Sequence, residues 1–523
     1  MTAGWIRMLR LQWRTSWGML LGAPILLAVL VTLIAAGISE LYPDLAAREI
    51  YAATMATSPA ATAFNGRSYD VDTVGGIVAV ELGFMGQLAI PIVGAFQTLR
   101  LTRRLESSGA LELITACPVA RPAVPLAAFV SALLSWKLFA LFAFCGLVTQ
   151  DLPWVGAAHF VVILALFGLA FSGIGLLLGE LAGSYRTATG LALGTVFAAF
   201  IARALVDGLG LGLTWVNPMG WVAEAKPWGD PELWPYLFFL ALALASACAG
   251  ISVCTRRDLG SGVIPARLGR AVARPGLATP WGFLWRVSIG ASAGWLVGIL
   301  VWAAVIGAMS QEFVDAIAAN PSLAASFGTA PEHMATVVAV LLAAALATAA
   351  GLSVLLSHGA SELSSRLGLL HAGRYSRGLW WLVWNVSSLL VAGVALLGAV
   401  TVLGLVQRRV MDRPAALSDA VGAGIDLLIP VLAMVAIGSF LVGVAPRSRA
   451  VAWLLPAWTV LVGLLGTALR MPEWLQNTSF VHVVGTVPVE AADGDALLAL
   501  GVLGAALLVL AWLAFRRRDL ARG

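Results

Sequence analysis

Ionisable side chains inside apolar segments are the first candidates for chemistry in this 523-residue chain. Glu81, Lys137 and Asp426 each lie within a long apolar run. Charges at membrane depth are costly and mark ion pathways, substrate pathways or structural pairs. Lys137 lies near the middle of its run and needs a carboxylate or a cavity, and Glu81 is one candidate partner. Glu81 and Asp426 lie near the ends of their runs, where a side chain that reaches the interface is the alternative explanation.

Two acidic motifs suggest an enzymatic alternative. Asp70-Val-Asp72 and Asp493-Gly-Asp495 fall between apolar runs, in segments that we expect outside the membrane. Carboxylates in such a loop can hold a metal ion or act as a base in polytopic glycosyltransferases. The tripeptide is common, however, and these loops are rich in acids. The five His and four Cys show no metal-ligand or disulfide spacing, so we expect no metal site.

The chain lacks the motif that would let it hydrolyse ATP as a P-loop protein. That motif needs GxxxxGK[ST], and the two lysines, Lys137 and Lys226, have no such context. We therefore expect no enzyme and no cofactor in this chain; if ATP drives it, a partner binds the ATP and magnesium. The alternative energy source is a proton gradient, with Glu81 and Asp426 as carriers in a drug antiporter.

The composition indicates a polytopic membrane protein. The chain is 60% hydrophobic and 11% charged, against about 25% charged in soluble proteins. Lipid admits only helices or closed barrels, and the runs are too long for barrel strands. The basic residues are scattered through short loops, so nucleic acid is not an expected partner. We predict an all-α fold with about twelve spans, at 18–38, 76–98, 123–148, 157–179, 187–206, 233–254, 287–308, 335–356, 381–406, 421–443, 450–469 and 495–515.

The loop charges predict the orientation. Most arginines fall in loops on the side of the N-terminus, and most acids fall on the other side. Both termini are therefore expected in the cytoplasm, with the protein in a bacterial plasma membrane. Before the first span, Arg7, Arg10 and Arg14 repeat at helical spacing opposite an apolar face. This pattern predicts a helix that lies in the membrane interface, in contact with anionic lipid.

The sequence also repeats itself. Arg257-Asp-Leu recurs as Arg518-Asp-Leu, 261 positions later, and Glu106 and Arg121 recur as Glu362 and Arg377, 256 positions later. The order and near-constant offset predict two six-span halves, 1–258 and 281–523, joined by a cytoplasmic linker, 259–280. Both halves start on the same side, so the repeat is parallel.

One outside segment, 215–230, is aromatic and broken by Pro and Gly, with a counterpart at 475–488. Such segments suit short half-helices in the outer leaflet. We predict an outer gate here, with ordinary capped loops as the alternative. Its candidate residues are Asn217, Pro218, Trp221, Pro227 and Trp228.

A short charged stretch, "ESSGALELITACPVAR" (106–121), interrupts two apolar runs on the inside. Gly109 and Pro118 bracket about two helical turns, and Leu111 and Ile114 share a face that can enter a groove on a partner. The charges can set the register of docking. The candidate coupling residues here are Glu106, Gly109, Leu111, Glu112, Leu113, Ile114, Pro118 and Arg121.

This stretch resembles the ExxGxxELLxxxPVxR signature of type 2 ABC exporter permeases, in which it forms the coupling helix after the second span. With the N-terminal elbow helix, "NPMGW" and the "RRDL" repeats, the whole chain resembles fused twelve-span permeases of actinobacterial polyketide-antibiotic exporters of the tetronasin type and of mycobacterial multidrug efflux. The resemblance implies a type V ABC transporter fold. It also implies two copies of a separate ATPase subunit, and export of hydrophobic drugs or polyketide-like compounds.

The second copy of the motif departs from the pattern. Gly109, Glu112 and Pro118 are replaced at the offset positions by Ser365, Gly368 and Arg374. The copy keeps Glu362, Leu369, Leu370 and Arg377. The two sites should therefore couple unequally, so that Glu112→Lys lowers substrate-stimulated ATPase activity more than Leu369→Lys.

Overall fold

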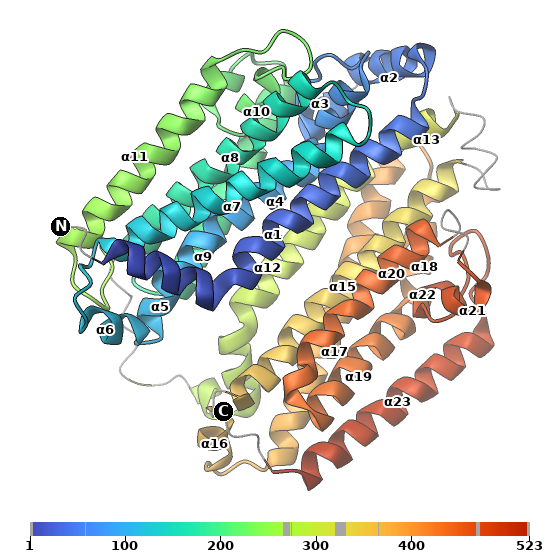
Figure 1. The fold of residues 1–523 in the computed structure, drawn as a ribbon. Coiled ribbons are helices and arrows are strands. Elements are labelled where there is room, and N and C mark those ends of the chain that lie inside the picture. Colours follow the sequence, from blue (N-terminus) through green and yellow to red (C-terminus); the bar gives the residue numbers. More distant parts are fainter. Residues whose placement is uncertain are drawn as a thin grey trace. The chain divides into compact units, whose positions relative to one another are not determined.

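The computed structural model describes residues 4–57, 59–264, 272, 275–318, 331–363, 366–466 and 471–519. Throughout this part of the chain the regular elements are helices, and the extended pairing is a single bridge, Ala182 to Ile264. The predicted all-α membrane fold is confirmed. The chain divides into two compact units, Met1–Gly269 and Arg270–Gly523, and the division falls inside the predicted linker (Figure 1).

Six long helices build unit 1, and short helices cover its two ends. The long helices are α1 (Trp5–Leu41), α4 (Val74–Leu101), α7 (Ala123–Val148), α8 (Trp154–Leu181), α9 (Tyr185–Gly208) and α11 (Trp234–Arg256). The short ones are α2 (Leu45–Thr57), α3 (Pro59–Asn65), α5 (Arg103–Ser107), α6 (Ala110–Thr115), η1 (Thr214–Val216) and α10 (Trp221–Glu224). Figure 1 shows α2, α3 and α10 at one end of the unit and α5 and α6 at the other.

Unit 2 repeats this plan. Its longer helices are α12 (Pro280–Ala308), α15 (Pro331–Leu363), α17 (Arg377–Val410), α18 (Ala416–Asp426), α19 (Leu428–Val444), α20 (Leu454–Leu465) and α23 (Gly494–Arg517). Its shorter pieces are η2 (Pro275–Ala278), α13 (Ser310–Ala318), α16 (Arg366–His371), η3 (Pro446–Trp453), α21 (Glu473–Gln476) and α22 (Phe480–Val483). α16 corresponds in sequence to α6 of unit 1.

Ten helices of the described residues are long and apolar enough to span a membrane, or eleven if the bent α4 counts as one span. α18 and α19 together form one of the ten. The exception to the twelve predicted spans is 450–469, which begins as the 3-10 helix η3 and continues as the 12-residue α20. Pro456 has no N–H to donate to the Ala452 carbonyl oxygen, so the α-helical hydrogen bonds do not run unbroken across the junction of η3 and α20. Residues 467–470 lie outside the described part, so a span at 450–469 stays a prediction.

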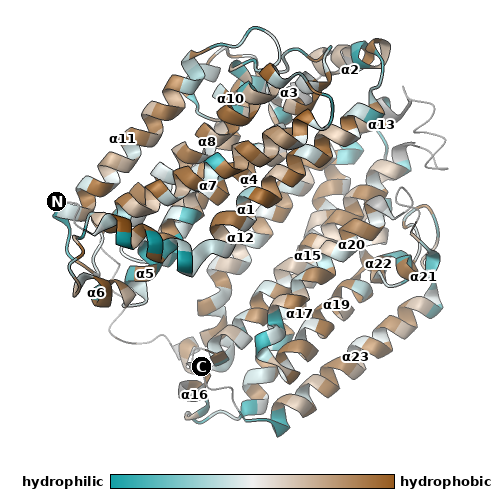
Figure 2. Ribbon diagram, viewed as in Figure 1, coloured by the Kyte–Doolittle hydropathy of each residue, from teal (hydrophilic) through white to brown (hydrophobic). Residues whose placement is uncertain are grey.

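The N-terminal segment forms the predicted amphipathic helix. α1 bends at Ser16, whose φ and ψ are −131° and 18°. Before the bend, Arg7, Arg10 and Arg14 are exposed while Met8 packs inward. Figure 2 shows hydrophilic residues gathered on this part of α1, whereas most of the long helices are apolar along their length. We call the part of α1 before the bend the elbow helix.

Small residues let the central helices of unit 1 approach closely. A Cβ placed on Gly175 of α8 would lie 2.5 Å from Ala95 Cα of α4, and one on Gly94 would lie 2.3 Å from the carbonyl oxygen of Gly168. Lipid gives no hydrophobic drive for helix association, so close backbone packing of this kind contributes much of the stability. The α4–α8 contact is therefore intolerant of larger side chains.

We expect Gly175→Val to push α4 and α8 apart and to destabilise the protein by about 1–3 kcal/mol, the usual cost of overpacking. Thermal unfolding of the purified protein in detergent measures the effect as a lower midpoint. Gly190→Val on α9 is the matched control, because nothing lies within 4 Å of a Cβ built there. Equal shifts for the two variants would contradict the close-packing account.

Candidate functional site

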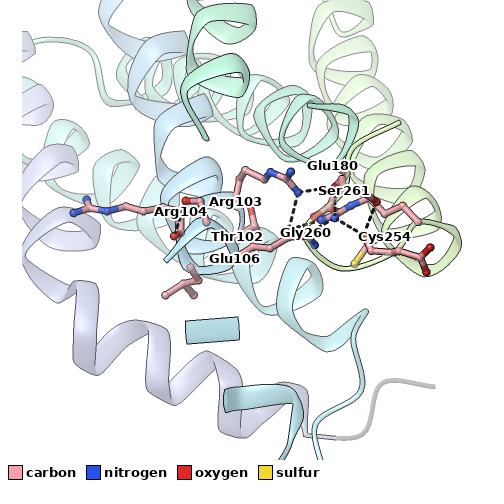
Figure 3. A network of polar contacts seen from close by, with 12 residues as sticks. Thr102, Arg103, Arg104, Glu106, Glu180, Cys254, Gly260 and Ser261 are labelled. Carbon is pink, nitrogen blue, oxygen red and sulfur yellow. Dashed lines mark hydrogen bonds and ion pairs between the residues drawn. The ribbon is translucent and has the colours of Figure 1, made fainter. Parts of the chain in front are cut away.

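A buried ion-pair network holds the short helix α5 to the ends of α8 and α11 (Figure 3). Arg257 Nη1 and Nη2 donate to Glu106 Oε1 and Oε2 at 2.6 and 2.5 Å, a bidentate pair. Arg257 Nε donates to Glu180 Oε2 at 2.7 Å. Arg103 Nη1 donates to Glu106 Oε2 at 2.8 Å, and the Gly260 N–H donates to Glu106 Oε1 at 2.7 Å. Two carboxylates and two guanidinium groups thus join three segments of unit 1.

Local sequence explains how Glu106 comes to face inward. α4 stops at Thr102, whose φ and ψ of −122° and −81° leave the helical region, and α5 starts there. Gly109 has a φ of 76°, a conformation that glycine adopts most easily, and it turns the chain from α5 into α6. Consequently α5 aims Glu106 at the network, while α6 buries Leu111 and leaves Leu113 76% exposed.

The Glu106–Arg257 pair is charged at neutral pH. Burial by itself would raise the pKa of Glu106, but the hydrogen bonds from Arg257 and the Gly260 N–H hold this pKa below its usual value. Burial would lower the pKa of Arg257, but the Glu106 and Glu180 carboxylates raise it. Bidentate arginine–carboxylate pairs of this kind fix geometry as well as charge.

Unit 2 contains a second copy of this arrangement. Arg518 donates to both carboxylate oxygens of Glu362, with Nη2 2.8 Å from Oε2. Arg377 Nη2 donates to the carbonyl oxygen of Arg518 at 3.3 Å, as Arg121 Nη2 donates to the carbonyl oxygen of Arg257 at 2.8 Å. The sequence repeat is therefore a structural repeat. We call the end of each unit that carries these pairs the network end.

The two copies differ in the group that accepts the hydrogen bond of the arginine Nε, which is charged in one copy and neutral in the other. In unit 1, Arg257 Nε bonds the Glu180 carboxylate at the end of α8. In unit 2, Arg518 Nε bonds the backbone carbonyl oxygen of Gly443, at the end of α19, at 2.6 Å. The second copy thus replaces a charged partner by a neutral one.

The two copies also differ in packing. In unit 1, a cavity of about 10 Å³ lies beside the network, with Thr102, Thr115 and Cys254 among its lining residues. The positions that correspond to these three in unit 2 are His358, His371 and Phe515, all larger. Rings fill that space in unit 2, where Phe515 is fully buried. His358 packs edge-on against Trp381, Trp384 and Phe515 at centroid distances of 5.2, 4.9 and 5.4 Å, and Trp381 stacks on Phe515 at 4.5 Å.

Comparison with known proteins identifies the family of this chain. Residues 277–516 match the family model of the "Multidrug efflux system permease Rv1217c, C-terminal domain". The chain is also similar to the multidrug efflux system permease protein Rv1217c of Mycobacterium tuberculosis strain H37Rv, with 30% identity over 99% of this chain and 95% of that protein. The chain belongs to the family of multidrug efflux system permeases.

Most predicted coupling residues of the permease lie on or beside α5 and α6, but their side chains divide into two groups. Glu106 and Leu111 face inward, and Arg121 contacts the end of α11. Gly109, Glu112, Leu113 and Pro118 are exposed, and Ile114 is half-buried. Glu106 thus lies inside the unit and not at an exposed rim, because Arg103 and Arg257 neutralise it there. Whether the exposed group contacts a partner stays a prediction.

In the second copy Glu362 is buried, and Leu370 and Arg377 are half-buried. The side chain of Leu369 and the whole of Ser365 lie outside the described residues.

The elbow helix of the permease packs directly on α6. Met8 of the elbow, Leu111 of α6 and Val124 of α7 form one buried cluster. Gly4, at the start of the elbow, lies so close to the 118–119 backbone that an added Cβ would be 3.0 Å from the Pro118 carbonyl oxygen. A displacement of α6 would therefore act on the elbow as well as on the network.

The intramembrane charges are placed differently from expectation. The suggested Glu81–Lys137 pair is wrong, because Glu81 Oε1 accepts a hydrogen bond from Tyr51 OH at 2.7 Å. Lys137 lies on an exposed face of α7 and forms no salt bridge with any described residue. Asp426 is half-buried at the break between α18 and α19.

The Asp493 carboxylate caps the N-terminus of α23, so the second acidic motif has a structural explanation.

The predicted outer-gate segment packs against its own unit. Asn217 Nδ2 donates to the Ala199 carbonyl oxygen of α9 at 2.7 Å, and Trp221 Nε1 donates to the Trp215 carbonyl oxygen at 2.7 Å. Trp228 lies against Phe160 with a centroid distance of 5.7 Å. Pro218 is half-buried and Pro227 is buried. A gating role for these residues stays a prediction.

Sequence reasoning missed Glu180 and Arg103. The predicted fourth span ends at residue 179, one position before Glu180, so this carboxylate did not count as intramembrane. A lone acid at the end of an apolar run, with arginines at the ends of neighbouring runs, was the signal that could have found it. Arg257 was noticed for its repeat, but without a role.

We expect Glu106→Gln to destabilise the permease by about 3 kcal/mol, because a broken buried ion pair leaves the Arg103 and Arg257 guanidinium groups short of a partner. Glu112→Gln is the control, since Glu112 is exposed, and it should change the free energy of unfolding by less than about 0.5 kcal/mol. Unfolding in denaturant and detergent measures both.

The pH dependence gives a second readout for the same variants. The pKa of Glu106 is lowered in the folded protein, so its stabilisation is complete at neutral pH and is lost as the pH falls below the ordinary range of glutamate, about 4.3. The unmodified protein and Glu112→Gln should both lose stability in that acid range more steeply than Glu106→Gln. Parallel curves would show that Glu106 does not carry the network.

Proposed function

We propose that this chain is the membrane permease of an ATP-driven ABC exporter that moves hydrophobic and amphipathic drugs out of the cell. Two copies of a separate ATPase subunit dock on α6 and α16 and bind the ATP and magnesium. The name of the similar Mycobacterium tuberculosis protein, multidrug efflux system permease, supports the efflux of drugs. The resemblance of residues 106–121 to a coupling helix supports the ATPase partner.

The network end of unit 1 is the observation that carries the proposal. α6 presents Leu113 and Glu112 to solvent, and its inner face is fixed to the unit through Leu111. Leu113 at 76% exposure is an anchor that a groove on a partner helix or domain can take. A force on α6 reaches α4 through the α5 backbone and reaches α8 and α11 through Glu106 and Arg257. Three membrane helices therefore move with α6.

The network ends of unit 1 and unit 2 should respond differently to the ATPase subunits. The cavity beside the first network leaves room for side chains to rearrange, whereas the rings around His358 and Phe515 pack the second network tightly. Close packing resists rearrangement, whereas a cavity lets neighbouring side chains move. We infer that unit 2 holds its ATPase subunit in a fixed position and that unit 1 makes the larger conformational step.

Purification of the tagged permease from its native membrane, followed by ATP hydrolysis assays, tests the proposal directly. We expect an ATPase subunit to co-purify and its activity to rise when a hydrophobic drug is added. Absence of any ATPase, together with efflux that a protonophore abolishes while cellular ATP stays high, would instead establish a proton-coupled antiporter.

The asymmetry has a matched test, since Leu113 and Leu369 occupy the same position in the two copies. Leu113→Lys should lower drug-stimulated ATPase activity of the assembled complex at least about ten-fold, the effect of one lost interface anchor, and Leu369→Lys should lower it less. Leu45→Lys, at the opposite end of unit 1 and 52% exposed, should leave the activity unchanged. Equal losses for Leu113→Lys and Leu369→Lys would refute unequal coupling.

A further inference from the structure

An open groove lies between the elbow helix and α7 on the surface of unit 1. It has a volume of about 480 Å³ and is lined by Arg10 and Trp13 of the elbow and by Leu134, Lys137, Leu138 and Leu141 of α7. The four α7 residues follow i, i+3, i+4, i+7 spacing, so they form one stripe along the helix. We call this site the elbow groove.

Lys137 is the unexplained charge of this groove. It lies past the middle of α7, a membrane-spanning helix, and its side chain is exposed. Along the described chain it has no carboxylate within salt-bridge distance, and its expected partner Glu81 bonds Tyr51 instead. A cation at such a depth is costly unless a counter-charge or water solvates it. The compensating group must therefore come from outside this part of the chain.

The groove combines this charge with a second cationic residue. Arg10 lines the same groove from the elbow helix, beside the ring of Trp13. The lysine stem can lie along the leucine stripe and carry its ammonium group toward the elbow. The groove thus has an apolar floor with two cationic residues among its lining, and none of its six lining residues is acidic.

We propose that the elbow groove binds one anionic phospholipid. The phosphate is held by Arg10 and Lys137, and an acyl chain packs along the leucine stripe of α7. A phospholipid supplies the negative charge and the apolar chain in one molecule, whereas free phosphate would leave the leucines uncovered. The elbow helix also displays Arg7 and Arg14 to solvent, which draws anionic lipid to this part of the membrane surface. Because the elbow packs on α6 through Met8 and Leu111, the bound lipid stabilises the position of α6.

Native mass spectrometry of the full-length permease tests the site with phosphatidylglycerol and phosphatidylcholine of identical acyl chains. We expect one phosphatidylglycerol to bind more tightly than phosphatidylcholine, by about five-fold for each cation that holds the phosphate. Lys137→Met, which keeps an unbranched apolar stem, should weaken phosphatidylglycerol binding about five-fold and phosphatidylcholine binding less, because the choline cation already offsets the charge of its phosphate. Lys137→Arg should retain the preference, which separates loss of charge from misfolding.

Arg14→Ala is the matched control, because Arg14 is exposed on the same helix but does not line the groove. It should keep the phosphatidylglycerol preference, and Arg10→Ala should reduce it. Equal binding of the two lipids, or an unchanged preference in Lys137→Met, would overturn the proposal. Inorganic phosphate that stabilises the protein against heat as well as phosphatidylglycerol does would also overturn it, since the leucine stripe would then have no role.

Discussion

The bidentate pair between Glu106 and Arg257 is the interaction on which the network end of unit 1 depends. It forms only because three chain segments bring opposite charges together where little water reaches them. Glu180 adds a second carboxylate to the same arginine, so that the end of α8 shares the constraint. Buried ion pairs contribute little net stability but penalise any arrangement that separates them. The pair therefore specifies how α5 sits against α8 and α11.

Each unit carries one such end, and the two ends differ in the contacts that stabilise them. Glu362 and Arg518 preserve the ion pair in unit 2, while Gly443 supplies a backbone carbonyl where unit 1 has Glu180. Aromatic rings around His358 compensate for the missing charge by close packing. One end is thus held mainly by charge and the other by both charge and ring contacts. The ring contacts around His358 depend on close packing and not on the exclusion of water from a charge. They therefore make the network end of unit 2 the more rigid of the two.

The elbow groove lies on the surface of unit 1, where the surrounding membrane lipid can reach it. The elbow helix contacts α6 through Met8 and also lines a groove that includes the cationic residues Arg10 and Lys137. A lipid in that groove and a partner on α6 would act on the same short segment from two directions. If the proposed lipid and ATPase partner bind there, the contact between Met8 and Leu111 would couple the two binding events.

The sequence by itself determined the all-α membrane fold, the positions of most spans, the amphipathic elbow and the internal repeat, because hydropathy and charge spacing are local properties of a chain in lipid. It also singled out residues 106–121. Only the tertiary structure decided that Glu106 points inward, that Glu81 bonds Tyr51 and that Lys137 has no partner in the described chain. Partnership between distant charges depends on which helix faces meet, and spacing along one helix does not encode the rotation of its neighbour.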